Sequence, residues 1–118
     1  MIATANHGGT GESSGRIAAL NDALRRTGRG GRLMMTTRVA ALPDCERLAI
    51  IEAVRTFDRF DATNNPHGER DFGALLSGER RAFWKIDYYD QTLTAGSPDP
   101  ADPSLTVRVL TIMLREEY

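Results

Sequence analysis

The residues that could do chemistry gather in one polar stretch and in the strand-like segment after it. The stretch from Asp58 to Asp71 ends in a histidine and two carboxylates, and the later segment adds a lysine and two more carboxylates: His67, Glu69, Asp71, Lys85, Asp87 and Asp90. Carboxylate oxygens suit hard divalent cations, and a histidine beside carboxylates can also serve as an acid/base pair. The cluster therefore predicts a divalent-cation site or a general acid/base site.

The same cluster also has a purely structural interpretation. Glu69 and Asp71 can pair with nearby arginines and hold the loop closed, and their spacing matches no zinc or EF-hand signature. The order Lys85-Ile86-Asp87 reverses the acid-x-lysine order that a restriction-type nuclease requires. No Gly-x-Ser-x-Gly sequence occurs, and Cys45 falls in a predicted helix. The residues themselves name no reaction and imply no cofactor.

Other residues suggest binding. Tyr88 and Tyr89 fall on opposite faces of a regular strand, so we expect one of them to be a partner contact. Arg25, Arg26 and Arg29, beside a glycine-rich turn, could meet nucleic-acid phosphates or could be the solvated end of a helix. Direct DNA binding is therefore an open alternative.

The charge is balanced overall but unevenly distributed. The 118 residues carry 15 basic and 16 acidic side chains, without the strong positive field that marks nucleic-acid binders. Residues 1–38 hold six arginines and two acids, whereas residues 82–118 hold three basic and six acidic residues. Fourteen of the 15 basic residues are arginine, as expected for a GC-rich coding genome. The chain thus has a basic front and an acidic back.

Cellular location follows from the apolar runs and the cysteine content. No apolar run approaches the roughly 20 residues that span a bilayer, so we expect no membrane association. Residues 1–15 are rich in glycine and lack a hydrophobic signal region, which predicts a disordered lead. A single cysteine excludes an internal disulfide, and we expect a cytoplasmic protein.

The first half of the domain should contain two helices and a strand. The spacing predicts a helix over Arg16–Thr27, with one apolar stripe inward and with Asn21, Asp22, Arg25 and Arg26 facing away. A strand is expected over Arg32–Ala40. A second helix should begin with Asp44 as its N-cap and bury Ile50, Ile51, Val54 and Phe57.

The second half reads as strands. Phe72–Leu76 and Arg81–Tyr89 should form a hairpin, with Ala82, Trp84, Ile86 and Tyr88 on one face. Alternation places Lys85 and Asp87 on the other face, from which both could meet the polar loop. A proline-rich loop precedes a strand at Leu105–Leu114, although residues 110–117 could also form a short helix. We therefore predict one α+β domain over residues 16–118, with a mainly antiparallel sheet of about four strands and two helices on one face.

Several segments resemble a known family. They are Asn64–Gly73, Phe83–Asp90, Gly96–Pro103, Arg108–Leu114 and the final Glu117-Tyr118, and they are similar to the small bacterial proteins called domain of unknown function 3768. The resemblance runs from about Ile17 to the C-terminus. It implies an origin in high-GC alphaproteobacteria, on plasmids and integrated mobile elements near anti-restriction genes, and it implies no activity.

The polar loop departs from the family pattern. The family tends to read Asn-Asp-Pro-Tyr-Gly-Glu-His-Asp-Phe-Gly, whereas Asn65, His67 and Arg70 stand here at the Asp, Tyr and His positions. If the loop acted through that histidine, Arg70 would remove the chemistry.

The functional prediction is a non-catalytic protein of a bacterial mobile element. It would bind a protein or ribonucleoprotein defence complex as an anti-CRISPR or anti-restriction factor, with the acidic back and one tyrosine as contacts. Two alternatives stay open: a small metal-assisted enzyme built on Glu69, Asp71 and Asp87, and a DNA-binding accessory protein that uses the basic front.

Overall fold

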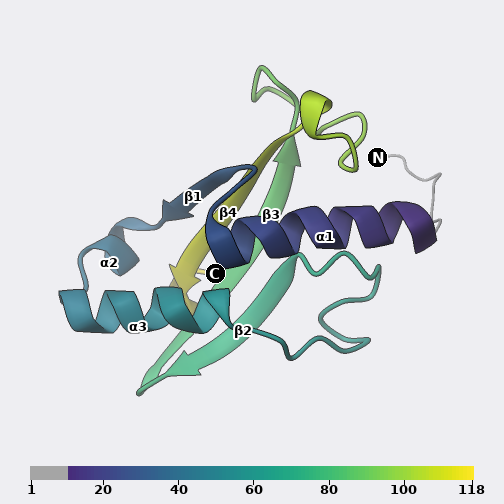
Figure 1. The fold of residues 1–118 in the computed structure, drawn as a ribbon. Helices are drawn as coiled ribbons and strands as arrows, with labels where there is room; N and C mark the ends of the chain where they lie inside the picture. Colours follow the sequence, from purple (N-terminus) through teal and green to yellow (C-terminus); the bar gives the residue numbers. More distant parts are fainter. Residues whose placement is uncertain (1–10) are drawn as a thin grey trace.

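Four strands form one mixed sheet in the computed structural model of the protein, which describes residues 11–118 (Figure 1). The strands are β1 (Arg32–Met35), β2 (Phe72–Ser77), β3 (Arg80–Tyr89) and β4 (Val107–Leu114). Their spatial order is β1-β4-β3-β2, with β1 parallel to β4 and both other pairs antiparallel. The predicted α+β class and mainly antiparallel sheet are confirmed.

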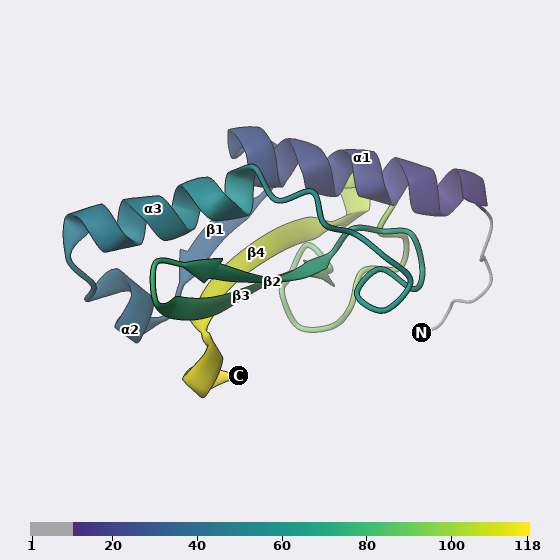
Figure 2. The ribbon, with the colours of Figure 1, turned by 90° about the horizontal axis from the view of Figure 1, so that it is seen from below.

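Two helices, α1 (Gly11–Thr27) and α3 (Asp44–Arg55), lie together on one face of this sheet (Figure 2). A one-turn helix α2 (Thr37–Ala40) links β1 to α3, and short 3₁₀ turns occur at Pro103–Leu105 (η2) and Arg115–Glu117 (η3). Figure 2 shows the C-terminal turn on the side of the sheet opposite α1 and α3. The domain is therefore two layers thick, and the helices leave one sheet face uncovered.

The beginning of the domain differs from the prediction. Helix α1 starts at Gly11, so residues 11–15 belong to the helix and not to a disordered lead, while residues 1–10 lie outside the described part of the chain. Each residue added to an existing helix gains a hydrogen bond without a new nucleation cost. The amphipathic segment from Arg16 can therefore extend backwards over small residues that would not form a helix alone.

Two boundaries between residues 32 and 44 were also wrong. The strand ends at Met35, because Thr36 caps α2 through its side-chain oxygen, which accepts from the Val39 backbone N–H. The threonine pair that suggests a strand thus starts a helix that buries Val39 completely. Pro43, not Asp44, is the N-cap of α3, and Asp44 lies in the first turn, where it pairs with Arg47.

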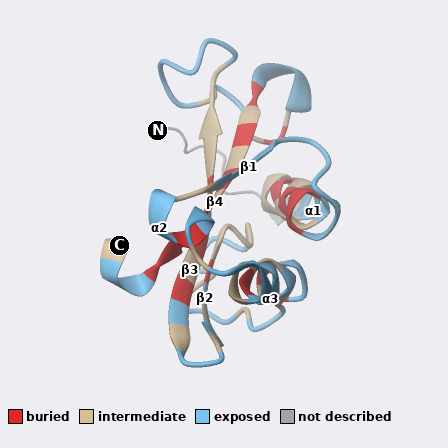
Figure 3. Cartoon of the chain, turned by 90° about the vertical axis from the view of Figure 1, so that its left-hand side faces the viewer, coloured by how far each residue is buried: buried red, intermediate tan, exposed pale blue. Residues whose placement is uncertain are grey.

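The core lies between the sheet and the two long helices. Trp84, Ile86, Leu110 and Ile112 rise from the sheet to meet apolar side chains of α1 and α3, which include Leu24, Ile50 and Val54. Figure 3 shows buried stretches of the chain along β3 and β4 and on α1 and α3. Trp84 is fully buried, and an added Cβ at Gly73 on the neighbouring strand would lie 2.4 Å from its Nε1 atom. A side chain at residue 73 is thus excluded by the indole.

Candidate functional site

The predicted loop cluster is tied to the body of the protein through Tyr88. The Tyr88 hydroxyl donates to Glu69 Oε1 at 3.0 Å, and Asn21 Nδ2 donates to that hydroxyl at 2.8 Å and to the Glu69 carbonyl at 3.0 Å. Burial and the nearby acids raise the pKa of Tyr88, which keeps the hydroxyl protonated as a donor. Glu69 therefore serves to anchor the loop on α1 and β3.

A buried arginine completes this network from β4. Arg108 is 1% exposed, and its Nε donates to Asn21 Oδ1 at 2.7 Å while its Nη2 donates to the Pro100 carbonyl. Its guanidinium carbon lies 5.2 Å from the centroid of the Tyr88 ring. Burial lowers the pKa of Arg108, but a guanidinium stays charged in proteins. The negative charge of Glu69 is thus offset by the buried positive charge of Arg108.

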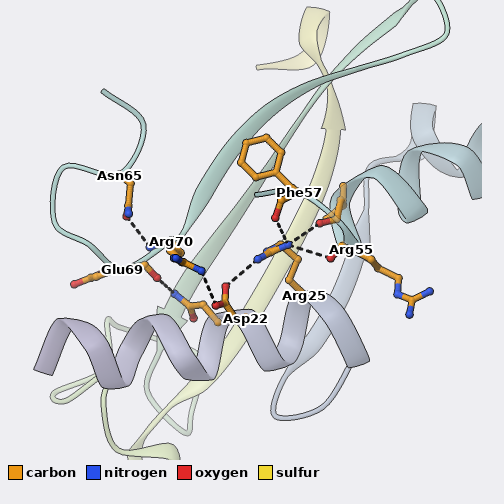
Figure 4. A network of polar contacts seen from close by, with 9 residues as sticks. Asp22, Arg25, Arg55, Phe57, Asn65, Glu69 and Arg70 are labelled. Carbon is orange, nitrogen blue, oxygen red and sulfur yellow. Dashed lines mark hydrogen bonds and ion pairs between the residues drawn. The ribbon is translucent and has the colours of Figure 1, made fainter. Parts of the chain in front are cut away.

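A second network surrounds Arg25, which the helical spacing had placed in solvent. Arg25 is 3% exposed and pairs with Asp22 Oδ1 at 2.8 Å (Figure 4). The second oxygen of Asp22 accepts from Arg70 Nη1 at 3.0 Å, so the loop meets α1 again at this point. The prediction that Asn21, Asp22 and Arg25 face away was wrong, because α1 packs against the sheet, α3 and the polar loop together.

The aromatic side chains beside Arg25 explain how a cation is accommodated there. Its guanidinium carbon lies 5.3 Å from the Trp84 ring centroid and 5.5 Å from that of Phe60. Aromatic faces carry negative potential, which offsets part of the cost of removing the charge from water. Burial lowers the pKa of Arg25 even so. Arg25 is therefore a structural residue and cannot reach a nucleic-acid phosphate.

The remaining loop and strand acids do not assemble into one site. Asp71 is half-buried, and its pKa is raised by burial first and by repulsion from Glu69 second. Asp90 accepts hydrogen bonds from the Thr92 and Thr94 backbone N–H groups at the turn after β3, and His67 is exposed. Within residues 11–118, no group of three His, Cys, Asp or Glu side chains is arranged to hold a metal ion.

Lys85 and Asp87 form an ion pair with each other. Neither forms an ion pair with the polar loop, which the strand alternation had allowed both to reach. Their Nζ and Oδ2 atoms lie 3.0 Å apart, and the pair raises the pKa of Lys85 chiefly through the side-chain hydrogen bond. Both stand on the sheet face that the helices leave uncovered. The strand residue that does meet the loop is Tyr88, from the opposite face.

This uncovered surface, called here the open face, is largely apolar. Strand registers place side chains of β2, β3 and β4 next to one another on it: Phe72, Phe83, Lys85, Asp87, Tyr89, Val107, Val109 and Thr111. All of these residues are half-buried. Of the two tyrosines considered for partner contact, Tyr89 is therefore the one on the open face. Tyr88 is half-buried on the helix-covered face, and its hydroxyl is bonded to Asn21 and Glu69.

An aromatic cluster marks one end of the open face. The Phe83 ring centroid lies 4.8 Å from that of Tyr118 and 5.6 Å from that of Phe72. Tyr118 itself is 71% exposed. Sequence reasoning missed this cluster, although the alternation in β2 and β3 would have placed the two phenylalanines together. Tyr118 lies outside the strands, so no alternation pattern could have placed it beside the two phenylalanines.

The basic front is divided by the fold. Arg25 is buried, whereas Arg26, Arg29 and Arg32 stay exposed around the end of α1 and the start of β1. An added Cβ at Gly31, within this turn, would lie 2.4 Å from the Arg108 carbonyl oxygen, so the chain passes directly against β4. This close approach keeps the exposed arginines at the sheet edge.

The fold and these networks define a small two-layer α+β protein with one helix-covered and one open sheet face. The chain belongs to the family described as protein of unknown function DUF3768, whose family model matches residues 35–117. The matched part runs from the last residue of β1 to η3, so Asn21 and Arg25 on α1 precede it. No curated protein and no solved structure matches the chain.

No helix within residues 11–118 combines the length and the apolar character that a membrane-crossing helix needs.

Proposed function

We propose that this protein is a non-catalytic binding protein and that the open face is its contact surface. The observation that carries the proposal is the half-exposed apolar surface of β3 and β4, with Tyr89 and the Phe72-Phe83-Tyr118 cluster at its two ends. Aromatic side chains dominate the energetics of protein interfaces, and a half-exposed aromatic gives up little rotamer entropy on binding.

The charges of the open face favour a protein partner over a nucleic acid. Lys85 and Asp87 neutralise each other at its centre. A phosphate backbone is bound through several unpaired lysines or arginines. An aromatic surface whose central charges are paired with each other instead resembles the core of a protein interface, where charged residues are depleted.

The partner that we propose is a protein or ribonucleoprotein complex of bacterial defence, bound in the cytoplasm. Support comes from the mobile-element context that the family resemblance implies, since a mobile element gains from blocking restriction or CRISPR complexes. The engagement of Glu69 by Tyr88 and of Asp87 by Lys85 supports a binding role over a catalytic one. An inhibitor of this kind needs a complementary folded surface and no reaction of its own.

Phage plating tests this proposal directly. The protein is expressed in hosts that carry one defined restriction or CRISPR complex, and plating efficiency is measured together with co-purification of that complex. Val109→Asp puts a charge into the middle of the open face and should abolish both effects. Leu48→Asp is the matched control, because Leu48 is 61% exposed on α3, away from the open face.

The possible outcomes distinguish the anti-defence role from the location of the contact surface. Rescue of phage by the wild type and by Leu48→Asp, but not by folded Val109→Asp, supports the proposal. A folded wild-type protein that neither binds nor inhibits any of the defence complexes overturns the anti-defence role. Equal activity of Val109→Asp and wild type overturns the open face as the contact surface.

A further inference from the structure

A pocket of about 250 Å³ opens between the C-terminal end of α1, helix α3 and the sheet. Its apolar lining comes from all three elements and includes Leu24, Leu33, Ile51, Val54, Leu110 and Ile112. Leu33 pairs in register with buried Leu110, so it belongs to the helix-covered face, yet it is 47% exposed. The helices therefore leave the β1 edge of this face incompletely covered.

Arginines surround this apolar pocket. Arg26 and Arg55 line it, Arg29 follows in the turn after α1, and Arg32 is the first residue of β1. Arg55 is occupied, since it pairs with Glu52 at 3.0 Å and donates to the Arg26 carbonyl at 3.0 Å. Within residues 11–118, no carboxylate forms an ion pair with Arg26, Arg29 or Arg32. Arg26 thus stands exposed at the apolar pocket with Arg29 just after it, while Arg32 stands exposed at the same sheet edge on the opposite face, because its register partner is Val109.

The adjoining strand has a free edge. β1 is the terminal strand of the sheet and pairs with β4 alone among the described strands. An exposed edge strand can accept an extended segment through backbone hydrogen bonds, and alternate side chains of that segment then reach one face of the sheet. The face on the pocket side begins with Leu33.

We propose that this corner of the protein binds an extended acidic segment of a partner protein. The segment adds to the free edge of β1 and inserts one large apolar side chain into the pocket. Its carboxylates meet Arg26 and Arg29 on the pocket side and Arg32 on the opposite face of the strand. The volume suits a single anchor side chain, because it lies below the ~300–1,000 Å³ that small-molecule sites occupy. This site is separate from the open face and does not depend on the function proposed for that face.

The charges also argue against a second copy of this chain as the occupant. A second copy paired along β1 (Arg32–Met35) would bring its own Arg29 and Arg32 to the shared edge, and the strand itself supplies no carboxylate to pair with them. Like charges placed directly opposite each other destabilise a strand pair. An acidic segment from a different protein satisfies the same arginines.

The experiment uses a fluorescently labelled peptide in which glutamates alternate with threonines around one central phenylalanine. Fluorescence anisotropy with the full chain should show saturable binding that weakens as salt increases. Two comparison peptides, one with lysine for glutamate and one with alanine for phenylalanine, should each bind at least about tenfold more weakly, or about 1.4 kcal/mol. Saturable binding of the lysine peptide with equal affinity overturns the proposal, as does no binding up to about 1 mM.

Variants locate the binding on the surface. Leu33→Glu and the double change Arg26→Glu with Arg29→Glu should each reduce affinity at least about tenfold. Leu48→Glu and Arg59→Glu are the matched controls, since both residues are exposed and lie outside the pocket. Phe72→Asp, on the open face at the far edge strand β2, should leave peptide binding unchanged, which separates this site from the open face. Unchanged affinity in folded Leu33→Glu, or a stable homodimer by light scattering that Leu33→Glu dissolves, overturns the proposal.

Discussion

Arg25 and Arg55 cap each other's helices. Arg25 Nη1 donates to the Arg55 carbonyl at 3.1 Å and to those of Val54 and Phe57, at the end of α3, while Arg55 Nε donates to the Arg26 carbonyl at the end of α1. The last carbonyls of a helix lack internal partners and carry partial negative charge. Two such ends can lie side by side here because each receives an arginine from the other helix. Figure 4 shows the Arg25 side chain reaching the end of α3.

Loss of the buried member of this pair should be severe. Arg25→Met leaves Asp22 Oδ1 and the carbonyls at the end of α3 without the Arg25 donor, and we expect the free energy of unfolding to fall by about 3–5 kcal/mol. Arg26→Met, at the exposed neighbouring position, should change it by no more than about 0.5 kcal/mol. Urea denaturation measures both variants. Similar losses at the two positions would contradict the capping role.

The Tyr88 hydroxyl should hold the polar loop in place. Tyr88→Phe removes an acceptor from Asn21 and a donor from Glu69, and should cost about 1–3 kcal/mol. Amide hydrogen exchange in residues 58–71 should accelerate in this variant. Tyr89→Phe on the open face is the control and should alter neither the stability nor the exchange. Unchanged loop exchange in Tyr88→Phe would show that other contacts hold the loop.

Two glycine substitutions should act in opposite directions. Gly73→Ala forces a methyl group against the Trp84 indole and should destabilise the protein by about 1–3 kcal/mol. Gly15→Ala, in helix α1 with open space around it, should stabilise by about 0.5–1 kcal/mol because alanine favours the helix. Thermal melting of both variants provides the comparison. A stabilising Gly73→Ala would require a different packing around Trp84.

Asp71 should make stability depend on pH. Burial and Glu69 raise its pKa in the folded protein, so its protonated form is the one that favours folding. That contribution is complete below the unfolded value of about 3.9 and is lost as the pH rises through the folded value. Asp71→Asn should therefore melt above the wild type at pH 7, and the difference should shrink toward pH 3.5. Asp58→Asn, at an exposed position, should show no such trend in the same series. A constant difference across the series would contradict the assignment.

Divalent metal ions should not stabilise the protein. Glu69 is bound by Tyr88 on the helix-covered side, while Asp87 is paired with Lys85 on the open face, so the acids of the enzyme alternative point to different partners. Titration with Mg²⁺, Mn²⁺ or Zn²⁺ should leave the thermal midpoint unchanged. A rise that Asp71→Ala abolishes would instead favour the metal-assisted enzyme.

DNA binding through the basic front makes a different prediction. Because Arg25 is buried, only Arg26 and the exposed arginines that follow it remain for phosphate contact. We expect no salt-sensitive retention of the protein on a DNA column at moderate ionic strength. Retention that Arg26→Ala reduces would support the DNA-binding alternative.

Several features could be predicted from the sequence because they depend on neighbours along the chain. Period-two alternation placed Trp84, Ile86 and Tyr88 on one face of a strand, and the structure confirms it. The turn at Ser77–Glu79 made β2 and β3 a hairpin, and the apolar stripe near Ile50 and Val54 identified α3. The family segments likewise carried the DUF3768 membership.

Tertiary structure decided which polar residues lie inside. The helical period showed only that Asn21 and Arg25 lie off the apolar stripe of α1, and polarity suggested solvent. They are buried because carbonyl, hydroxyl and carboxylate partners arrive from residues far along the chain, at Phe57, Glu69, Tyr88 and Arg108. The parallel pairing of β1 with β4, on which the arginine-rimmed pocket depends, joins residues about 77 positions apart. Sequence periodicity identifies which face of an element is apolar. It does not identify the distant hydrogen-bond partners that offset the free-energy cost of burying a charge.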